Sequence, residues 1–281
     1  MNRKPLHLND KALTSLVGLV PDGITEVFCD NNLLTSLEGL PKSVEEVYCS
    51  ANQLTTLEGL PESVKIIHCR VNPSLTTLKG LPENIQRINC VDCSLTSLEG
   101  LPEGVERIHC KQNKLTSLKG LPKSVRRVYC SNNELTSFEG LPEGVKRIWF
   151  KKNNLTSLKG LPKSVEEVYC SHNPITSLEG LPENTVEVNC SYTPLTSLEG
   201  LPEGIEVVYC SNCNLTSLKG LPEGIDRVFC GNNKLTSLEG LPKHTFVDYI
   251  HNPIWWQHIR EKYTELELPS KGCYKIIQHL Q

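Results

Sequence analysis

Residues 34–53 read LTSLEGLPKSVEEVYCSANQ, and near-copies of this stretch fill most of the chain. Twelve copies begin at Leu13, Leu34, Leu54, Leu75, Leu95, Leu115, Leu135, Leu155, Ile175, Leu195, Leu215 and Leu235. The period is 20 residues, extended to 21 in the first and third copies. Such a period is too short for two packed helices and fits one coil of a solenoid. The sequence therefore predicts one elongated repeat domain.

Each copy contains a short stretch with the pattern of a half-buried strand. In residues 46–50 the apolar Val47 and Cys49 alternate with Glu46, Tyr48 and Ser50. Alternation with a period of two is typical of a strand with one face in the core. Stacked copies place these strands side by side in parallel, about 4.8 Å apart. We expect one long parallel sheet.

The remainder of each copy is not compatible with a regular helix. Gly39 and Pro41 lie in its middle, and the other copies repeat this Gly-Leu-Pro sequence. Glycine destabilises a helix interior, and proline removes a backbone donor there. We expect extended or polyproline-like backbone opposite the strands.

The chain has 13 cysteines, and most of them follow the repeat. Phe150 fills the same position in one copy, so the position requires an apolar side chain and not a thiol. The sequence thus predicts no metal, no cofactor and no disulfide-linked partner. The ten cysteines of this position are Cys29, Cys49, Cys69, Cys90, Cys110, Cys130, Cys170, Cys190, Cys210 and Cys230.

An asparagine recurs three residues after the cysteine position. An amide both donates and accepts, so it can pair backbone groups that a buried turn leaves open. We expect a structural role for this column, which contains Asn32, Asn52, Asn72, Asn113, Asn133, Asn153, Asn173 and Asn233.

The pattern Val-x-x-Val-x-Cys-x-x-Asn-x-Leu-x-x-Leu-x-x-Leu-Pro resembles the leucine-rich repeat, and its 20-residue length with Leu-Pro is similar to the bacterial effector type. Similar repeats occur in proteins of giant viruses and amoeba-associated microbes. The resemblance implies a leucine-rich repeat solenoid, a curved array of about 12 coils with the sheet on the concave face. It divides the chain into an N-terminal cap (1–12), the repeat array (13–253) and a partly helical C-terminal cap (254–281).

Trp255, Ile259 and Tyr263 recur at helical spacing in the C-terminal segment. An amphipathic helix here would lay these side chains over the last coil, because a repeat array needs its ends covered. The alternative is that Trp255 and Trp256 bind a partner.

The sequence predicts a protein without enzymatic activity and without catalytic residues. Some relatives of the effector type carry a large ubiquitin-ligase domain, but only 28 residues follow Pro253. Cys273 has His279 nearby, yet a nucleophile also needs an orienting partner and a shaped pocket. The glycines mark repeated turns and form no phosphate-binding loop.

Residues 1–8 lack the apolar stretch of a secretory signal, and no segment reaches about 18 apolar residues. Abundant cysteine also favours a reducing compartment. We therefore expect a cytoplasmic protein, or one acting in the host cytoplasm if it is delivered as an effector, without membrane insertion.

Function is expected where the copies differ, at strand positions that face outward. The position before the inward Val or Ile is arginine in four consecutive copies: Arg87, Arg107, Arg127 and Arg147. Like charges in neighbouring strands repel, so folding alone does not favour this column. It is a candidate partner-binding site.

The next outward position is mostly aromatic and includes His109, Tyr129 and Trp149, while Lys111 and Lys151 lie just past the same strands. Residues 101–152 hold eleven Lys and Arg against five Glu, a net charge of +6 in a chain of net charge −3. Acidic residues flank this centre. A purely structural explanation also exists, since aromatic side chains favour strand surfaces and stack along them.

Three hypotheses follow. The first is a non-enzymatic protein-interaction scaffold that binds the acidic surface of a protein partner through these nine residues. The second is binding of nucleic acid or another polyanion through the same basic and aromatic patch, against which the pI of about 6.3 counts. The third is an array of recently duplicated coils without a dedicated ligand.

Overall fold

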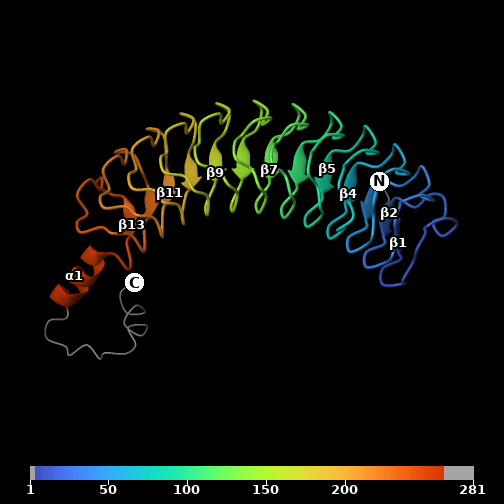
Figure 1. Cartoon of the computed structure of the whole chain (residues 1–281), viewed down its shortest axis with the longest axis horizontal. Coiled ribbons are helices and arrows are strands. Elements are labelled where there is room, and N and C mark those ends of the chain that lie inside the picture. The colour runs from blue at the N-terminus through green and yellow to red at the C-terminus, as the bar shows by residue number, and fades with distance from the viewer. Residues whose placement is uncertain (1–3, 263–281) are drawn as a thin grey trace.

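The computed structural model describes residues 4–262, which form a curved array of stacked coils (Figure 1). One sheet of 13 parallel strands runs through the whole array, and its strands follow one another in sequence order. One helix follows the last strand. The predicted solenoid with a single long parallel sheet is confirmed.

Every strand is three residues long, since each coil must turn away from the sheet on both sides of the strand. The elements are β1 (Pro5–His7), β2 (Glu26–Phe28), β3 (Glu46–Tyr48), β4 (Ile66–His68), β5 (Arg87–Asn89), β6 (Arg107–His109), β7 (Arg127–Tyr129), β8 (Arg147–Trp149), β9 (Glu167–Tyr169), β10 (Glu187–Asn189), β11 (Val207–Tyr209), β12 (Arg227–Phe229), β13 (Phe246–Asp248) and α1 (Pro253–Lys262).

The core is a set of apolar columns that runs along the array. The middle residue of a strand points inward, so Val47 and Val128 have no exposed surface. The cysteines that directly follow ten of the strands are also buried, and Phe150 takes this place after β8 without any exposed surface. The Phe150 ring lies 5.6 Å from the ring of Phe138, which replaces a repeat leucine. The cysteine position is thus an apolar packing position.

The asparagine column joins each coil to the one before it. The Asn133 Nδ2 donates to the carbonyl oxygens of Cys110 (3.0 Å) and Cys130 (3.1 Å), and its Oδ1 accepts from the Leu115 N–H (3.0 Å). One buried amide therefore pairs backbone groups on two coils, as expected. Thr193 stands in this column and donates to the Cys190 carbonyl at 2.7 Å.

The turns opposite the sheet depend on glycine because neighbouring coils approach closely there. Gly140 has a φ of +90°, and a Cβ at this position would lie 2.4 Å from the Lys119 backbone nitrogen. Such a contact is far too short for a side chain. This is the physical reason why Gly-Leu-Pro recurs in the repeat.

Helix α1 begins against the last coil. The Ile254 N–H donates to the Leu235 carbonyl (3.0 Å), and the Ile254 side chain is buried. Trp255 is half-buried and Trp256 is 41% exposed. Both predicted alternatives, a helix that covers the last coil and tryptophans that bind a partner, are therefore compatible with the structure. Tyr263 lies outside the described residues.

No helix among residues 4–262 has the length and apolarity needed to cross a membrane.

Candidate functional site

Four neighbouring strands, β5 to β8, present the predicted site residues. In each three-residue strand the middle side chain points into the core, while the first and third point away from it. The strands pair in parallel without a shift in register. Equivalent side chains therefore form two outward-facing rows, one of arginines and one of mostly aromatic rings, and most of these residues are half-buried.

The arginine row has two different parts. Arg87 pairs with Arg107 across the sheet, and Arg107 pairs with Arg127. No carboxylate of the described residues lies within ion-pair distance of these three guanidinium groups. Arg147 differs, because its Nε lies 2.8 Å from the Glu167 Oε1 on the next strand. Within this row of four, the arginines without an ion pair among the described residues are therefore those of β5, β6 and β7.

The second row is a ladder of stacked rings. The ring centroids of His109 and Tyr129 lie 3.9 Å apart, those of Tyr129 and Trp149 4.1 Å, and those of Trp149 and Tyr169 5.2 Å. The planes of neighbouring rings lie within 16° of parallel, so the two inner rings, Tyr129 and Trp149, have both faces covered. Stacking along the sheet therefore accounts for how these aromatic side chains pack. Their ring edges remain available to a ligand.

His109 is a neutral ring at physiological pH. Burial, and secondly the positive charge of Arg107, lower the pKa of its imidazole to about 4. Burial likewise lowers the pKa of His68. The positive charge of the site therefore comes from arginine and lysine side chains.

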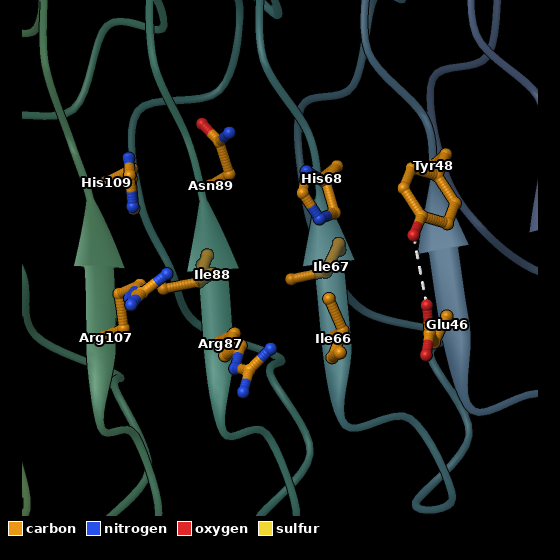
Figure 2. Close-up of a pocket in the computed structure, with 10 residues that line it drawn as sticks. All are labelled: Glu46, Tyr48, Ile66, Ile67, His68, Arg87, Ile88, Asn89, Arg107 and His109. Atoms are coloured by element: carbon orange, nitrogen blue, oxygen red, sulfur yellow. Dashed lines mark hydrogen bonds between the residues drawn. The ribbon is translucent and has the colours of Figure 1, made fainter.

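The predicted residues surround three shallow hollows. Arg87, Arg107 and His109 border a hollow of about 430 Å³ over β3 to β6, shown in Figure 2. Arg127 joins Arg87 and Arg107 around a hollow of about 280 Å³, which Glu106 and Arg126 also line. The third hollow, of about 500 Å³, is bordered by His109, Tyr129, Trp149, Lys111 and Lys151. Arg147 lies outside these three hollows.

The aromatic ladder separates the two kinds of basic side chain. Arginines lie at the beginning of the strands, and the exposed Lys111 and Lys151 lie just beyond their ends. His109 belongs to hollows on both sides. The site is therefore an open surface with a ridge of rings, and it is not a closed pocket of the kind that enzymes use for small substrates.

Several residues at the site were missed by sequence reasoning. Glu46, Tyr48, Ile66, His68 and Asn89 line the first hollow. Asn89 was visible as a non-aromatic residue in an aromatic column, but its importance depends on the side chains on both sides. The sequence alone did not show that a hollow forms there.

The described cysteines are all buried and none is in a disulfide. Burial raises the pKa of Cys170 to about 12, and the pKa of Cys49 lies well above the usual thiol value for the same reason. A thiol with a raised pKa is a poor nucleophile and a poor metal ligand. Within residues 4–262, no cluster of His, Cys, Asp and Glu side chains could hold a metal ion.

Comparison with known proteins bears on the fold. Over 88% of its length the chain superposes on YopM from Yersinia enterocolitica WA-314, with a TM-score of 0.74 and 24% identity. It also superposes on the leucine-rich repeat domain of FLRT2 in a complex with Latrophilin 3 and Unc5D, with a TM-score of 0.70, 19% identity, and coverage of 88% of this chain and 90% of that one. The chain folds as a leucine-rich repeat solenoid.

A third solved structure is YopM of Yersinia pestis, described as a leucine-rich effector protein. It matches with a TM-score of 0.58 and 26% identity, over 89% of this chain and 84% of that chain. The predicted similarity to repeats of the bacterial effector type is thus confirmed. The chain spans 60% of the length of the Yersinia enterocolitica YopM. Neither a family model nor a curated protein sequence matches the present chain.

Proposed function

We propose that the chain is a non-enzymatic scaffold that binds an acidic surface of a partner protein on strands β5 to β8. The observation that carries this proposal is the run of Arg87, Arg107 and Arg127, which are in register and lack a carboxylate partner among the described side chains. The partner supplies the carboxylates.

The energetics of the row favour such a partner. The arginines come from adjacent strands whose backbones lie about 4.8 Å apart, and their like charges repel each other in the free protein. Carboxylates of a partner relieve this repulsion and form charge-assisted hydrogen bonds, which arginine makes in pairs. Arginine and aromatic side chains are also frequent among the residues that dominate protein interfaces.

Two further observations support a protein as the ligand. The FLRT2 repeat domain, to which this solenoid is similar, is found in a complex with other proteins. The open surface also suits the face of a protein better than a small substrate. By similarity to the YopM effector of Yersinia pestis, we extend the proposal to a partner in the cytoplasm, of a host cell if the chain is delivered there.

Nucleic acid is the second candidate, and the aromatic ladder counts against it. Single-stranded nucleic acids bind by stacking bases on ring faces. Tyr129 and Trp149 have both faces covered by neighbouring rings. Glu167 and Glu187 occupy the equivalent position on the next two strands, so the basic row ends there and offers no longer track for a phosphate backbone.

The test is to reverse the charge of the row. The variant Arg107→Glu/Arg127→Glu should lose at least about tenfold in partner affinity, because each contact with a charged group contributes about 1.5–3 kcal/mol. Binding is measured by affinity purification with quantitative mass spectrometry, and then by titration with the purified partner. Arg227→Glu is the matched control, since Arg227 occupies the same exposed position on β12, outside the row.

A partner that the double variant binds as tightly as the wild type would contradict the assignment. Thermal unfolding of both variants should stay close to that of the wild type, because exposed charges contribute little to stability. Steeply salt-dependent binding of single-stranded RNA, without binding of an acidic protein, would favour the second candidate.

A further inference from the structure

The aromatic ladder is interrupted at Asn89. On one side the rings of His7, Phe28, Tyr48 and His68 stack in order, with centroids 4.7, 4.5 and 4.7 Å apart. On the other side a second stack begins at His109. Asn89 lies between them, in register with His68 and His109. The two stacks therefore end in ring faces that look toward the same gap.

The gap has the width of one aromatic ring. His68 and His109 are two strands apart, which places them about 9.6 Å from each other. A ring halfway between them would lie about 4.8 Å from each, within the preferred range for stacked aromatic pairs. The rings of the ladder itself stack at this spacing, as the 4.7 Å between Tyr48 and His68 shows.

The gap is open to solvent. It belongs to the hollow of about 430 Å³, in which Figure 2 shows Asn89 in line with Tyr48, His68 and His109. The Asn89 amide is shorter than a ring, and its Oδ1 accepts a hydrogen bond from the Val91 N–H at 3.4 Å. The amide is thus held toward its own backbone, which leaves the outer part of the gap empty.

The surroundings of the gap select a particular ligand. Its walls are imidazoles whose pKa values burial lowers, so they are neutral rings at pH 7. Arg87 and Arg107 lie beside it in the neighbouring row, next to the apolar Ile66 (Figure 2). The carboxylate of this hollow, Glu46, lies two strands away from Arg87 and accepts a hydrogen bond from the Tyr48 hydroxyl at 3.0 Å. A planar apolar group fits between the walls, and an anionic group fits beside it.

We infer that the gap at Asn89 receives an aromatic side chain of the partner, flanked in the partner's sequence by carboxylates that pair with Arg87 and Arg107. This inference rests on the proposed function, and it identifies which part of an acidic partner is recognised. The guest ring completes the ladder from His68 to His109.

A second interruption of the ladder provides an internal control. Asn189 lies between Tyr169 and Tyr209 on the neighbouring strands. The arginine row has ended there, and Glu187 accepts a hydrogen bond from the Tyr169 hydroxyl at 2.8 Å. An acidic segment would meet a carboxylate at this gap, so we expect no binding of the same ligand.

The experiment uses three short peptides: Glu-Asp-Tyr-Asp-Glu, its leucine analogue Glu-Asp-Leu-Asp-Glu, and its uncharged analogue Gln-Asn-Tyr-Asn-Gln. Each is titrated calorimetrically into the wild type, Asn89→Phe and Asn189→Phe. Phenylalanine occupies the same column at Phe28 and Phe229, so both variants should fold. Asn89→Phe fills the gap with a ring of the chain itself.

The wild type should bind the tyrosine peptide about tenfold more tightly than the leucine peptide, because the ring gains two stacking contacts. Asn89→Phe should reduce the affinity for the tyrosine peptide to that for the leucine peptide, and Asn189→Phe should leave it unchanged. The uncharged peptide should bind more weakly than either acidic peptide.

The outcomes separate the inference from the function on which it rests. Equal binding of the two acidic peptides, or no effect of Asn89→Phe, overturns the inference and leaves the scaffold proposal intact. Binding of neither acidic peptide overturns both. Binding of a short oligothymidylate that Asn89→Phe abolishes, without peptide binding, would assign the gap to a nucleobase and overturn the assignment to a protein partner.

Discussion

Strands β5 to β7 and strands β8 to β9 share one backbone geometry but differ in their surface charges, which are alike on β5 to β7 and opposite on β8 and β9. On β8 and β9, Arg147 is paired with Glu167, with 2.8 Å between Nε and Oε1. Just before these strands, Lys146 forms an ion pair with Glu166. On β5 to β7, arginine lies beside arginine in the same register. The fold accommodates both arrangements.

This difference shows that the exposed row is not constrained by the scaffold. Opposite charges would have been available to the same positions, as β8 and β9 demonstrate. The like charges of β5 to β7 therefore call for a reason outside the fold. The binding of an acidic partner that we propose would provide that reason.

The largest expected effect on stability comes from the buried asparagine column, in contrast to the arginine row. Asn133→Leu leaves the Leu115 N–H unpaired and removes one of the donors to the Cys110 and Cys130 carbonyls. We expect a loss of about 3 kcal/mol in the free energy of unfolding. Arg127→Glu in the same coil should change it by less than about 0.5 kcal/mol. Urea denaturation of both variants measures the contrast, and similar losses would remove it.

The fold was predictable from the sequence because its columns repeat with every coil. Alternation around Val47 and Cys49 indicated the strand, Gly-Leu-Pro excluded a helix on the opposite side, and Phe150 showed that the cysteine position is apolar. Register then followed from the period, and with it the rows of arginines and rings.

The details of the site were not predictable in the same way. The ion pair of Arg147 depends on the rotamers of two long side chains, so four arginines in sequence became three uncompensated arginines in the structure. The hollow at Asn89 depends on which rings stack on either side of it. A sequence column gives order along the array but not these contacts.

A smaller effect is expected from extending the arginine row into β9. Glu167→Arg removes the ion pair with Arg147 and adds a fifth like charge in register. We expect a loss of about 1 kcal/mol at low salt that shrinks as salt screens the repulsion. Glu167→Gln, which removes the pair without adding charge, should lose about half as much. A loss that does not depend on salt would contradict a charge-based origin.

His109, at the end of the ring stack next to Asn89, should make stability depend on pH. His109 takes up a proton near pH 6.5 in the unfolded chain but only at about 4 in the folded protein. The unfolded state therefore binds more protons between these values, and stability falls as the pH falls through this window. From pH 7 to pH 4.5 the wild type should lose more stability than His109→Phe, which keeps the ring. Parallel losses would show that His109 is not responsible.

The central claim is that the arginine row serves binding and not folding, and Arg107→Glu tests it most directly. The new carboxylate would lie between Arg87 and Arg127, as Glu167 lies beside Arg147. The account predicts a gain of about 0.5 kcal/mol in the free energy of unfolding at low salt, which disappears at high salt, together with a loss of partner binding. A loss of about 1 kcal/mol or more in the free energy of unfolding, which is as large as the contribution of an exposed ion pair, would contradict the account. It would show that the arginines stabilise the fold.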